Sequence, residues 1–368
     1  MTDMSSETAT TVRAGAMMDR LASISRGGGA AAVADKLVAL REFLEDDLRE
    51  VEESLAAVET MRATPLHRSA RHLLDLGGKR LRPTCVALAA RVGTGFNPAA
   101  REVAVAVELV HNATLLHDDV VDFGDVRRGA PTARVLYGNA ASIFAGDWLL
   151  VEALQRVQRL GLPGLLERLL GVLKEMLEGE ALQLANRGKL RTSQADYFKV
   201  IEGKTASLFR WGLMAGGRAG QVAPAHGEAL ERFGQALGVA FQVIDDVLDV
   251  AGDGATIGKT MFADLREGKV TYPLLVALER DEDLERLVAE ALAADAGAGG
   301  ADHATDSDRA GREGEVARRM RACGAIEDSR QLASKLSSEA LGHLHELPAG
   351  PVRDALEGVA MAMLHRVL

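Results

Sequence analysis

Two clusters of aspartates in this chain have the composition and spacing of a divalent-metal site. Asp118, Asp119 and Asp122 end a strongly apolar run of residues that Phe123 and Gly124 interrupt. The C-terminal end of a helix carries partial negative charge, so carboxylates are unfavourable there unless a cation compensates them. Asp118 and Asp122 stand at positions i and i+4 and share one helix face, and oxygen-only ligands suit Mg²⁺ better than zinc. We therefore predict a divalent metal at this helix end.

The second cluster repeats this arrangement further along the chain. Asp245, Asp246 and Asp249 follow the mostly apolar residues 241–244 and precede two glycines. A single acidic helix end is most simply a solvated surface, because the chain contains 53 Asp and Glu residues. Two copies, each at the end of an otherwise apolar helix, favour metal binding over that alternative. If the clusters face each other, they would bind several Mg²⁺ ions.

Basic residues lie where a metal-bound phosphate would need them. Mg²⁺ in proteins usually completes its coordination with water and substrate phosphates. The segment 77–83 (GGKRLRP) places Lys79 and Arg82 at a predicted helix start, where free N–H groups and the helix dipole favour an anion. A solvated basic turn is the alternative for this segment taken alone. With the aspartates, it predicts a diphosphate site.

Other polar residues extend this pattern more weakly. Arg127 and Arg128 follow the first acidic cluster closely enough for their guanidinium groups to reach phosphate oxygens. His111 lies on the apolar helix that leads to Asp118, where its default role is that of a satisfied polar residue near the core. Lys204 and Thr205 offer a cation, a hydroxyl and free amides at a predicted helix start. Lys259 and Lys269 flank the loop after the second acidic cluster, where either could be merely solvated.

Helical periodicity dominates the rest of the sequence. Apolar residues recur at three- and four-residue steps, and Ala, Leu, Glu and Arg far outweigh β-formers. No strand or hairpin pattern is evident, and Lys204-Thr205 is placed at a helix start. The pattern predicts an all-α fold with helices over 37–55, 100–122, 141–160, 164–186, 195–216, 227–250 and 269–292.

Composition excludes several classes of protein. The 368 residues are 47% hydrophobic and 26% charged, which is globular rather than disordered. A net charge of -10 argues against binding to nucleic acid through phosphate attraction. No apolar run approaches the length of a transmembrane helix. Cys85 and Cys323 have no metal-ligand spacing, which fits buried fillers in a reducing cytoplasm.

Two segments lack helical periodicity. Residues 1–35 are polar and end near three glycines, which predicts a disordered N-terminal tail. Residues 293–314 are rich in Gly, Ala and Asp and predict a mobile surface insertion rather than a domain boundary. We therefore expect one catalytic domain over 36–368.

Taken together, these motifs resemble the trans-polyprenyl diphosphate synthases. The resemblance covers the chain from about residue 36 to its C-terminus and rests on five segments: GGKRLRP (77–83), HNATLLHDDVVD (111–122), DVRRGAPT (125–132), GKT (203–205) and FQVIDDVLDVAGD (241–253). It implies one large bundle of antiparallel helices around a central cavity, usually in a homodimer. It also implies a prenyltransferase that elongates an allylic diphosphate with isopentenyl diphosphate, using Mg²⁺.

The resemblance assigns roles residue by residue. The catalytic set is Asp118, Asp119, Asp122, Lys204, Asp245, Asp246 and Asp249. Of these, Asp118, Asp122 and Asp245 would bind metal, while Asp246 and Asp249 would orient metal-bound water. The residues for isopentenyl diphosphate would be Lys79, Arg82, His111 and Arg128. Those for the allylic diphosphate would be Arg127, Lys204, Thr205, Gln242, Lys259 and Lys269.

The same family suggests where product length is set and where this chain departs from the pattern. Ala113, five positions before the first Asp, would line the tunnel for the growing product, followed by Val110 and Ala106. None is aromatic, which favours a long, octaprenyl-type or longer quinone side chain. The alternative is that Ala113 is only a close helix contact. Phe262 stands where relatives usually have Gly, two residues before Asp264, which puts the shape of that loop in question.

Three other functions stay open at this point. A shorter-chain geranylgeranyl or farnesyl diphosphate synthase would share every motif. A class I terpene cyclase would share the fold and the first acidic cluster, but would have an Asn/Ser/Glu pattern in place of Asp245, Asp246 and Asp249. A non-catalytic subunit of a heteromeric synthase would lack one or both clusters, and both are intact here.

Overall fold

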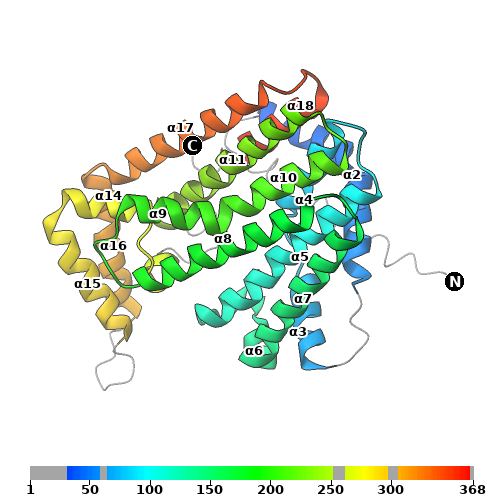
Figure 1. Cartoon of the computed structure of the whole chain (residues 1–368). Coiled ribbons are helices and arrows are strands. Elements are labelled where there is room, and N and C mark those ends of the chain that lie inside the picture. The colour runs from blue at the N-terminus through cyan, green and yellow to red at the C-terminus, as the bar shows by residue number, and fades with distance from the viewer. Residues whose placement is uncertain (1–30, 59–63, 252–261, 297–305, 365–368) are drawn as a thin grey trace. The chain divides into compact units, whose positions relative to one another are not determined.

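The computed structural model describes residues 31–58, 64–251, 262–296 and 306–364, and almost all of them are helical (Figure 1). The all-α class predicted from the sequence is therefore confirmed. The chain divides into two compact units. Unit 1 comprises Met1–Gly171, Leu208–Gly234 and His343–Ala362, and unit 2 comprises Val172–Ser207, Gln235–Gly342 and Met363–Leu368.

Unit 1 is built around a long buried helix, α5 (Pro98–Val121). The Asn97 side chain caps its start by accepting the N–H of Ala100 at 3.0 Å. The buried face of α5 consists mostly of Ala and Val, which lets α7 (Asn139–Arg159) pack closely along it (Figure 1). The other helices mainly in this unit are α2 (Ala31–Ala56), α3 (Pro65–Asp75), α4 (Leu81–Arg91), α6 (Ala133–Tyr137), α10 (Ser207–Ala219) and α18 (Pro351–Leu364).

Unit 2 contains two apolar clusters. The helices α8 (Leu165–Asn186) and α11 (Pro224–Ala251) continue into it from unit 1. The remaining elements of this unit are α9 (Gln194–Ile201), the π-helical turn η1 (Glu202–Ala206), α13 (Ala263–Arg266), α14 (Tyr272–Arg280), α15 (Glu282–Ala296), α16 (Asp306–Ala322) and α17 (Ala325–Leu344). One cluster contains residues of α11, α13, α14, α15, α16 and α17, and the other contains residues of α9, η1, α11, α14 and α17.

The expectation of no strand or hairpin is wrong at one place. The short strands β1 (Val126–Arg127) and β2 (Ala130–Pro131) pair antiparallel. Arg128 and Gly129 join them with φ angles of 54° and 79°. Positive φ at both residues is what a two-residue turn needs to follow the twist of a hairpin, and Gly129 is the sequence signal for it.

The single helix predicted over 269–292 is also wrong. Its apolar periodicity is shared by two helices, α14 and α15, with extended backbone at Asp281 between them. The Asp281 side chain accepts the N–H of Asp283 at 3.2 Å. Asp is among the preferred residues for capping a helix start, and here capping outweighs the periodicity.

Helices extend into both segments that lack helical periodicity. α2 begins at Ala31, inside the predicted tail, whereas residues 1–30 lie outside the described residues. α15 continues to Ala296 and α16 begins at Asp306, so that only 297–305 of the predicted insertion lie outside the described residues. Helix α16 is joined to α13 by two hydrogen bonds of 2.7 Å, which Glu313 accepts from Arg266. The composition of the segment does not reveal this tertiary contact.

No helix in the part of residues 31–364 that the structure describes is long and apolar enough to cross a bilayer.

Candidate functional site

The first aspartate cluster occupies the C-terminal end of α5. Asp118 and Asp122 are half-buried, and Asp122 is the C-cap, with its N–H donating to the Asp118 carbonyl at 2.8 Å. Asp119 is only 2% exposed and accepts a hydrogen bond from Arg127 Nε at 2.7 Å. Burial raises the pKa of Asp119 above its ordinary value even beside that guanidinium. Asp118 and Asp122 are therefore the more accessible pair of carboxylates.

The GGKRLRP segment forms a left-handed turn that leads into α4. Gly77 and Arg80 have φ angles of 69° and 49°, and Arg80 is the N-cap residue of the helix. Arg82 lies in the first turn, as the sequence predicts, and its guanidinium carbon stands 4.5 Å from the centre of the Phe209 ring. Lys79 and Arg82 thus lie on either side of Leu81, where the turn ends and α4 begins.

Arg80 lies at the centre of a buried ion cluster that the sequence analysis missed. Its Nε and Nη2 donate to the Glu52 carboxylate at 2.6 and 3.0 Å, and its Nη1 donates to Glu108 Oε1 at 2.6 Å. Burial alone would raise the pKa of Glu108, but Arg80 and the other cations nearby lower it to about 2. A Cβ atom on Gly78 would lie 2.9 Å from Arg80 Nη1, so the cluster requires glycine there.

His111 and Arg128 lie close to the same turn. A Cβ atom on Gly78 would stand 3.2 Å from Arg128 Nη2, which places that guanidinium beside the GGKRLRP segment. Burial and the charge of Arg82 lower the pKa of His111 well below 6.5. At neutral pH, His111 is therefore an uncharged hydrogen-bonding group beside cations. Arg82, His111 and Arg128, three of the residues predicted to bind isopentenyl diphosphate, therefore lie near this turn in unit 1.

The second aspartate cluster lies in the last described turns of α11, in unit 2. Asp246 is 2% exposed and accepts hydrogen bonds from Tyr197 Oη at 2.6 Å and Gln242 Nε2 at 2.8 Å. Gln242 Oε1 in turn accepts one from Thr205 Oγ1 at 2.9 Å. Burial and the charge of Asp264 raise the pKa of Asp246 well above its ordinary value. Tyr197 was missed from the sequence because it is 49 residues from Asp246.

The three aspartates of this cluster have different surroundings. Asp249 is buried, and its carboxylate accepts the backbone N–H groups of Ala263 at 3.1 Å and Asp264 at 3.4 Å. Asp246 is enclosed by the hydrogen bonds described above. Asp245 is half-buried and is the most accessible of the three.

The sequence predicts a helix start at Lys204 and Thr205, and this prediction is wrong. They lie in η1, a π-helical turn in the middle of a continuous helical segment formed by α9, η1 and α10. A Cβ atom on Gly203 would stand 2.6 Å from the Glu175 carbonyl oxygen, so this turn packs directly against α8. Lys204 Nζ donates to Gln183 Oε1 at 2.9 Å and pairs with Glu180, both on α8. Wide turns of this kind frequently occur at functional sites.

These side chains line a cavity of about 130 Å³, here called the unit 2 pocket. Its lining combines cations, hydroxyl groups and amides with apolar side chains such as Val200, Ile201 and Val270. The lining residues that the sequence analysis named are Lys204, Thr205, Gln242, Asp246 and Lys269. Asp264 and Asn186 also line it. The two lysines give the pocket cations with which an anionic group can pair.

The accessible carboxylates fit a hard divalent cation. Asp118, Asp122 and Asp245 offer only oxygen atoms, which are the donors that Mg²⁺ prefers. Their neighbours Asp119, Asp246 and Asp249 are already engaged by protein donors. Within the described ranges, no group of three or more His, Cys, Asp and Glu side chains surrounds a common point.

Two sets of predicted residues gain no functional evidence from the geometry. Ala106, Val110 and Ala113 are fully buried on α5, so their part in chain length stays a prediction. Lys259 lies outside the described residues. Phe262 lies within the described residues and has a φ of 59°. Its backbone is therefore in the left-handed conformation that glycine adopts without strain.

This all-α architecture is that of the isoprenyl synthases. The structure of a polyprenyl synthase from Caulobacter crescentus, complexed with calcium and isoprenyl diphosphate, matches with a TM-score of 0.80 and 34% identity over 89% of this chain and 97% of that one. A decaprenyl diphosphate synthase from Rhodobacter capsulatus matches with a TM-score of 0.80 and 34% identity over 90% and 99%.

The chain belongs to the polyprenyl synthetase family, whose model matches residues 63–303. It is 37% identical to the octaprenyl diphosphate synthase of Escherichia coli (strain K12) over 296 residues, which is 80% of this chain and 88% of that protein. It is 34% identical to the all-trans-nonaprenyl-diphosphate synthase (geranyl-diphosphate specific) of Rhodobacter capsulatus over 81% and 88%. The family makes this protein a prenyltransferase.

Proposed function

We propose that this protein condenses isopentenyl diphosphate with an allylic diphosphate in successive Mg²⁺-dependent head-to-tail steps. The product would be an all-trans polyprenyl diphosphate of quinone side-chain length. The observation that carries the proposal is that each unit places cations beside an aspartate cluster: Arg127 bonds to Asp119 in unit 1, and Lys204 and Lys269 line the same pocket as Asp246 in unit 2. Similarity to octaprenyl and nonaprenyl synthases supports the long product. We also propose that residues 36–368 act as one catalytic domain.

Magnesium would be bound by Asp118, Asp122 and Asp245. When bound, it would stabilise the negative charge that develops on the departing diphosphate. Asp119, Asp246 and Asp249 would fix the geometry of these ligands through Arg127, Tyr197 and the backbone of α13. Asp246 and Asp249 would also orient metal-bound water.

The cations of this chain would bind and orient the two diphosphates. Isopentenyl diphosphate would contact Lys79, Arg82, His111 and Arg128 in unit 1. The allylic diphosphate would contact Arg127, Lys204, Thr205, Gln242, Lys259 and Lys269. With its pKa lowered, His111 would donate a hydrogen bond without adding a charge. Guanidinium forks provide paired donors for phosphate oxygens.

The reaction needs no side-chain nucleophile. The allylic C–O bond ionises, the double bond of isopentenyl diphosphate attacks the carbocation, and a proton leaves to give the elongated product. The released diphosphate is the acceptor we favour for that proton. The role of Lys204 would be to stabilise the diphosphate as it departs, which is why it belongs to the catalytic set.

A homodimer is also part of the proposal. Leu170, Leu177 and Leu184 recur every seven residues along α8 and are 49%, 71% and 43% exposed. Apolar residues at this spacing form a stripe suited to a second helix. We expect a dimer in light scattering of the purified protein and a monomer after Leu177→Glu. The cytoplasmic location inferred from the sequence stays a prediction.

One assay tests the function. Purified protein with Mg²⁺ and labelled isopentenyl diphosphate would be incubated in turn with geranyl, farnesyl and geranylgeranyl diphosphates. We expect elongated products that chromatography resolves as long-chain polyprenols after dephosphorylation. Products that stop at C15 or C20 would identify a short-chain synthase. Cyclised hydrocarbon would identify a terpene cyclase, and no product with any primer would contradict the proposal.

A further inference from the structure

Phe262 combines an unfavourable backbone with a fully buried side chain. Its φ and ψ of 59° and 27° lie in the left-handed region, which costs energy for any residue with a Cβ atom. The side chain is nonetheless only 3% exposed. Strain of this kind persists where the surroundings fix it, and it often marks a position that matters for function.

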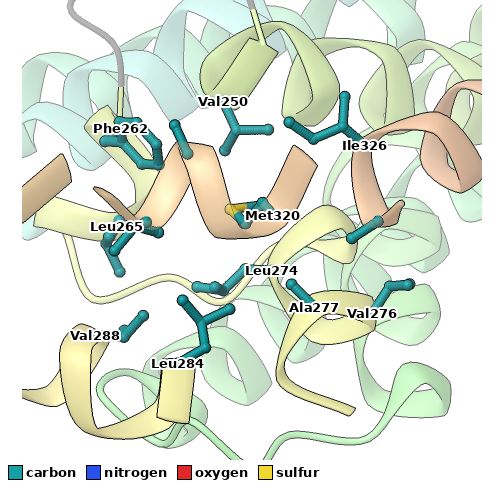
Figure 2. Close-up of a cluster of buried hydrophobic side chains, with 13 residues drawn as sticks. Val250, Phe262, Leu265, Leu274, Val276, Ala277, Leu284, Val288, Met320 and Ile326 are labelled. Carbon is teal, nitrogen blue, oxygen red and sulfur yellow. The ribbon is translucent and has the colours of Figure 1, made fainter. Parts of the chain in front are cut away.

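The surroundings that fix Phe262 are apolar. Its ring belongs to the cluster shown in Figure 2, with Leu265 of α13, Val250 of α11 and Met320 of α16. Burial of a phenyl ring is worth more than the strain of one left-handed residue. The ring therefore stabilises a backbone conformation that the residue would otherwise avoid.

The same backbone conformation brings three successive N–H groups to Asp249. Phe262 N–H donates to the Asp249 carbonyl at 3.1 Å, and the N–H groups of Ala263 and Asp264 donate to its carboxylate. Asp249 thus caps the start of α13 and joins it to α11. A second connection, from Arg266 to Glu313, joins α13 to α16.

These connections determine where two residues of the unit 2 pocket lie. Asp264 and Lys269 line the pocket, and Lys269 N–H donates to the Asp264 carbonyl at 2.8 Å. The Gly268 carbonyl accepts the N–H of Gly188 at 2.8 Å, which fixes the far end of the segment. Phe262 fixes the near end without lining the pocket itself.

We propose that Phe262 is a positioning residue, whose buried ring holds residues 262–269 so that Asp264 and Lys269 face the allylic diphosphate. This inference rests on the proposed function, because it takes the ligand of the unit 2 pocket to be that diphosphate. It predicts that loss of the ring weakens binding of the allylic substrate and leaves binding of isopentenyl diphosphate unchanged.

The test compares variants that alter the same cluster in different ways. Phe262→Gly keeps a backbone that accepts positive φ and removes the ring, whereas Phe262→Leu keeps apolar bulk. Leu284→Ala is the matched control, because Leu284 is fully buried in the same cluster but lies on α15, outside residues 262–269. Calorimetric titration with farnesyl diphosphate and Mg²⁺, without isopentenyl diphosphate, measures binding apart from turnover. Thermal melting measures stability for each variant.

We expect a dissociation constant for farnesyl diphosphate that is about tenfold higher in Phe262→Gly and within about twofold of the wild type in Phe262→Leu and Leu284→Ala. The melting temperature should fall in both Phe262→Gly and Leu284→Ala. The KM for isopentenyl diphosphate should not change in Phe262→Gly.

Two results would overturn the positioning role: wild-type affinity in Phe262→Gly, or an equal loss of affinity in Leu284→Ala. A wild-type protein that binds farnesyl diphosphate but elongates nothing would overturn the proposed function, while the comparison of dissociation constants would still decide the role of Phe262. A wild-type protein that does not bind farnesyl diphosphate would overturn both.

Discussion

Replacement of Glu108 by Gln should destabilise unit 1 because it removes one charge from the buried cluster around Arg80. The pKa of Glu108 falls from its ordinary 4.5 to about 2 in the folded protein. That difference corresponds to about 3 kcal/mol of stability at neutral pH. The Glu108→Gln variant should therefore lose about that amount at pH 7, since the amide keeps the shape of the side chain but not its charge.

The pH dependence follows from the direction of the shift. A carboxylate with a lowered folded pKa stabilises the protein above the unfolded pKa, and this stabilisation is lost as the pH falls from 4.5 towards 2. The difference in free energy of unfolding between wild type and Glu108→Gln should thus be constant from pH 7 to about 5.5 and shrink below 4.5.

Urea unfolding followed by tryptophan fluorescence measures this difference in the relevant unit. The chain has two tryptophans, Trp148 and Trp211, and both belong to unit 1. Glu102→Gln is the control on the same helix, because its bridge to Arg156 is partly exposed and should contribute about 1 kcal/mol or less. Equal losses in the two variants, or a difference that does not shrink in acid, would refute the reasoning.

Three further changes test other parts of the structure. Ala113→Phe should shorten the main product, as judged by chromatography of the polyprenols; an unchanged distribution would show that Ala113 does not face the product. Gly203→Ala should destabilise unit 2 by about 1–3 kcal/mol in thermal melting, because the methyl group of the alanine would clash with a carbonyl of α8. Gly342→Ala is the control: a Cβ atom there meets open space, so this variant should be as stable as the wild type or more stable. Burial lowers the pKa of His111, so the free energy of unfolding should fall as the pH drops through 6.5, where the unfolded chain takes up a proton. His111→Asn should remove this part of the dependence of the free energy of unfolding on pH between about pH 7.5 and 5.5. The same pH dependence in the variant and the wild type would contradict the prediction.

Local signals in the sequence were sufficient for the helix ends that carry the aspartates. Asp118 and Asp122 follow an apolar helix and precede Phe123, which has the positive φ of a helix end. The GGKRLRP turn was likewise predictable, because Gly77 marks the turn and Pro83 lies in the first turn of the helix that follows it. Both features depend on residues within about two helical turns of each other.

The contacts that support these ends could not be predicted in the same way. Arg80 joins Glu52 and Glu108, each 28 residues away, and Tyr197 reaches Asp246 across 49 residues. Such pairs depend on how helices pack, and neither periodicity nor motif spacing reports packing. The π-helical turn was missed for the same reason, since it packs against α8 through Gly203 and this contact joins residues far apart in the sequence.

The π-helical turn at Glu202–Ala206 makes the number of residues in this stretch critical. A turn with one extra residue rotates the following helix by roughly 100° relative to an uninterrupted α-helix. Tyr197 before the turn packs in unit 2, while Trp211 after it is buried in unit 1. Deletion of a single residue would keep the helix but rotate one of these aromatic rings out of its core. Homologous chains should therefore keep the same number of residues here.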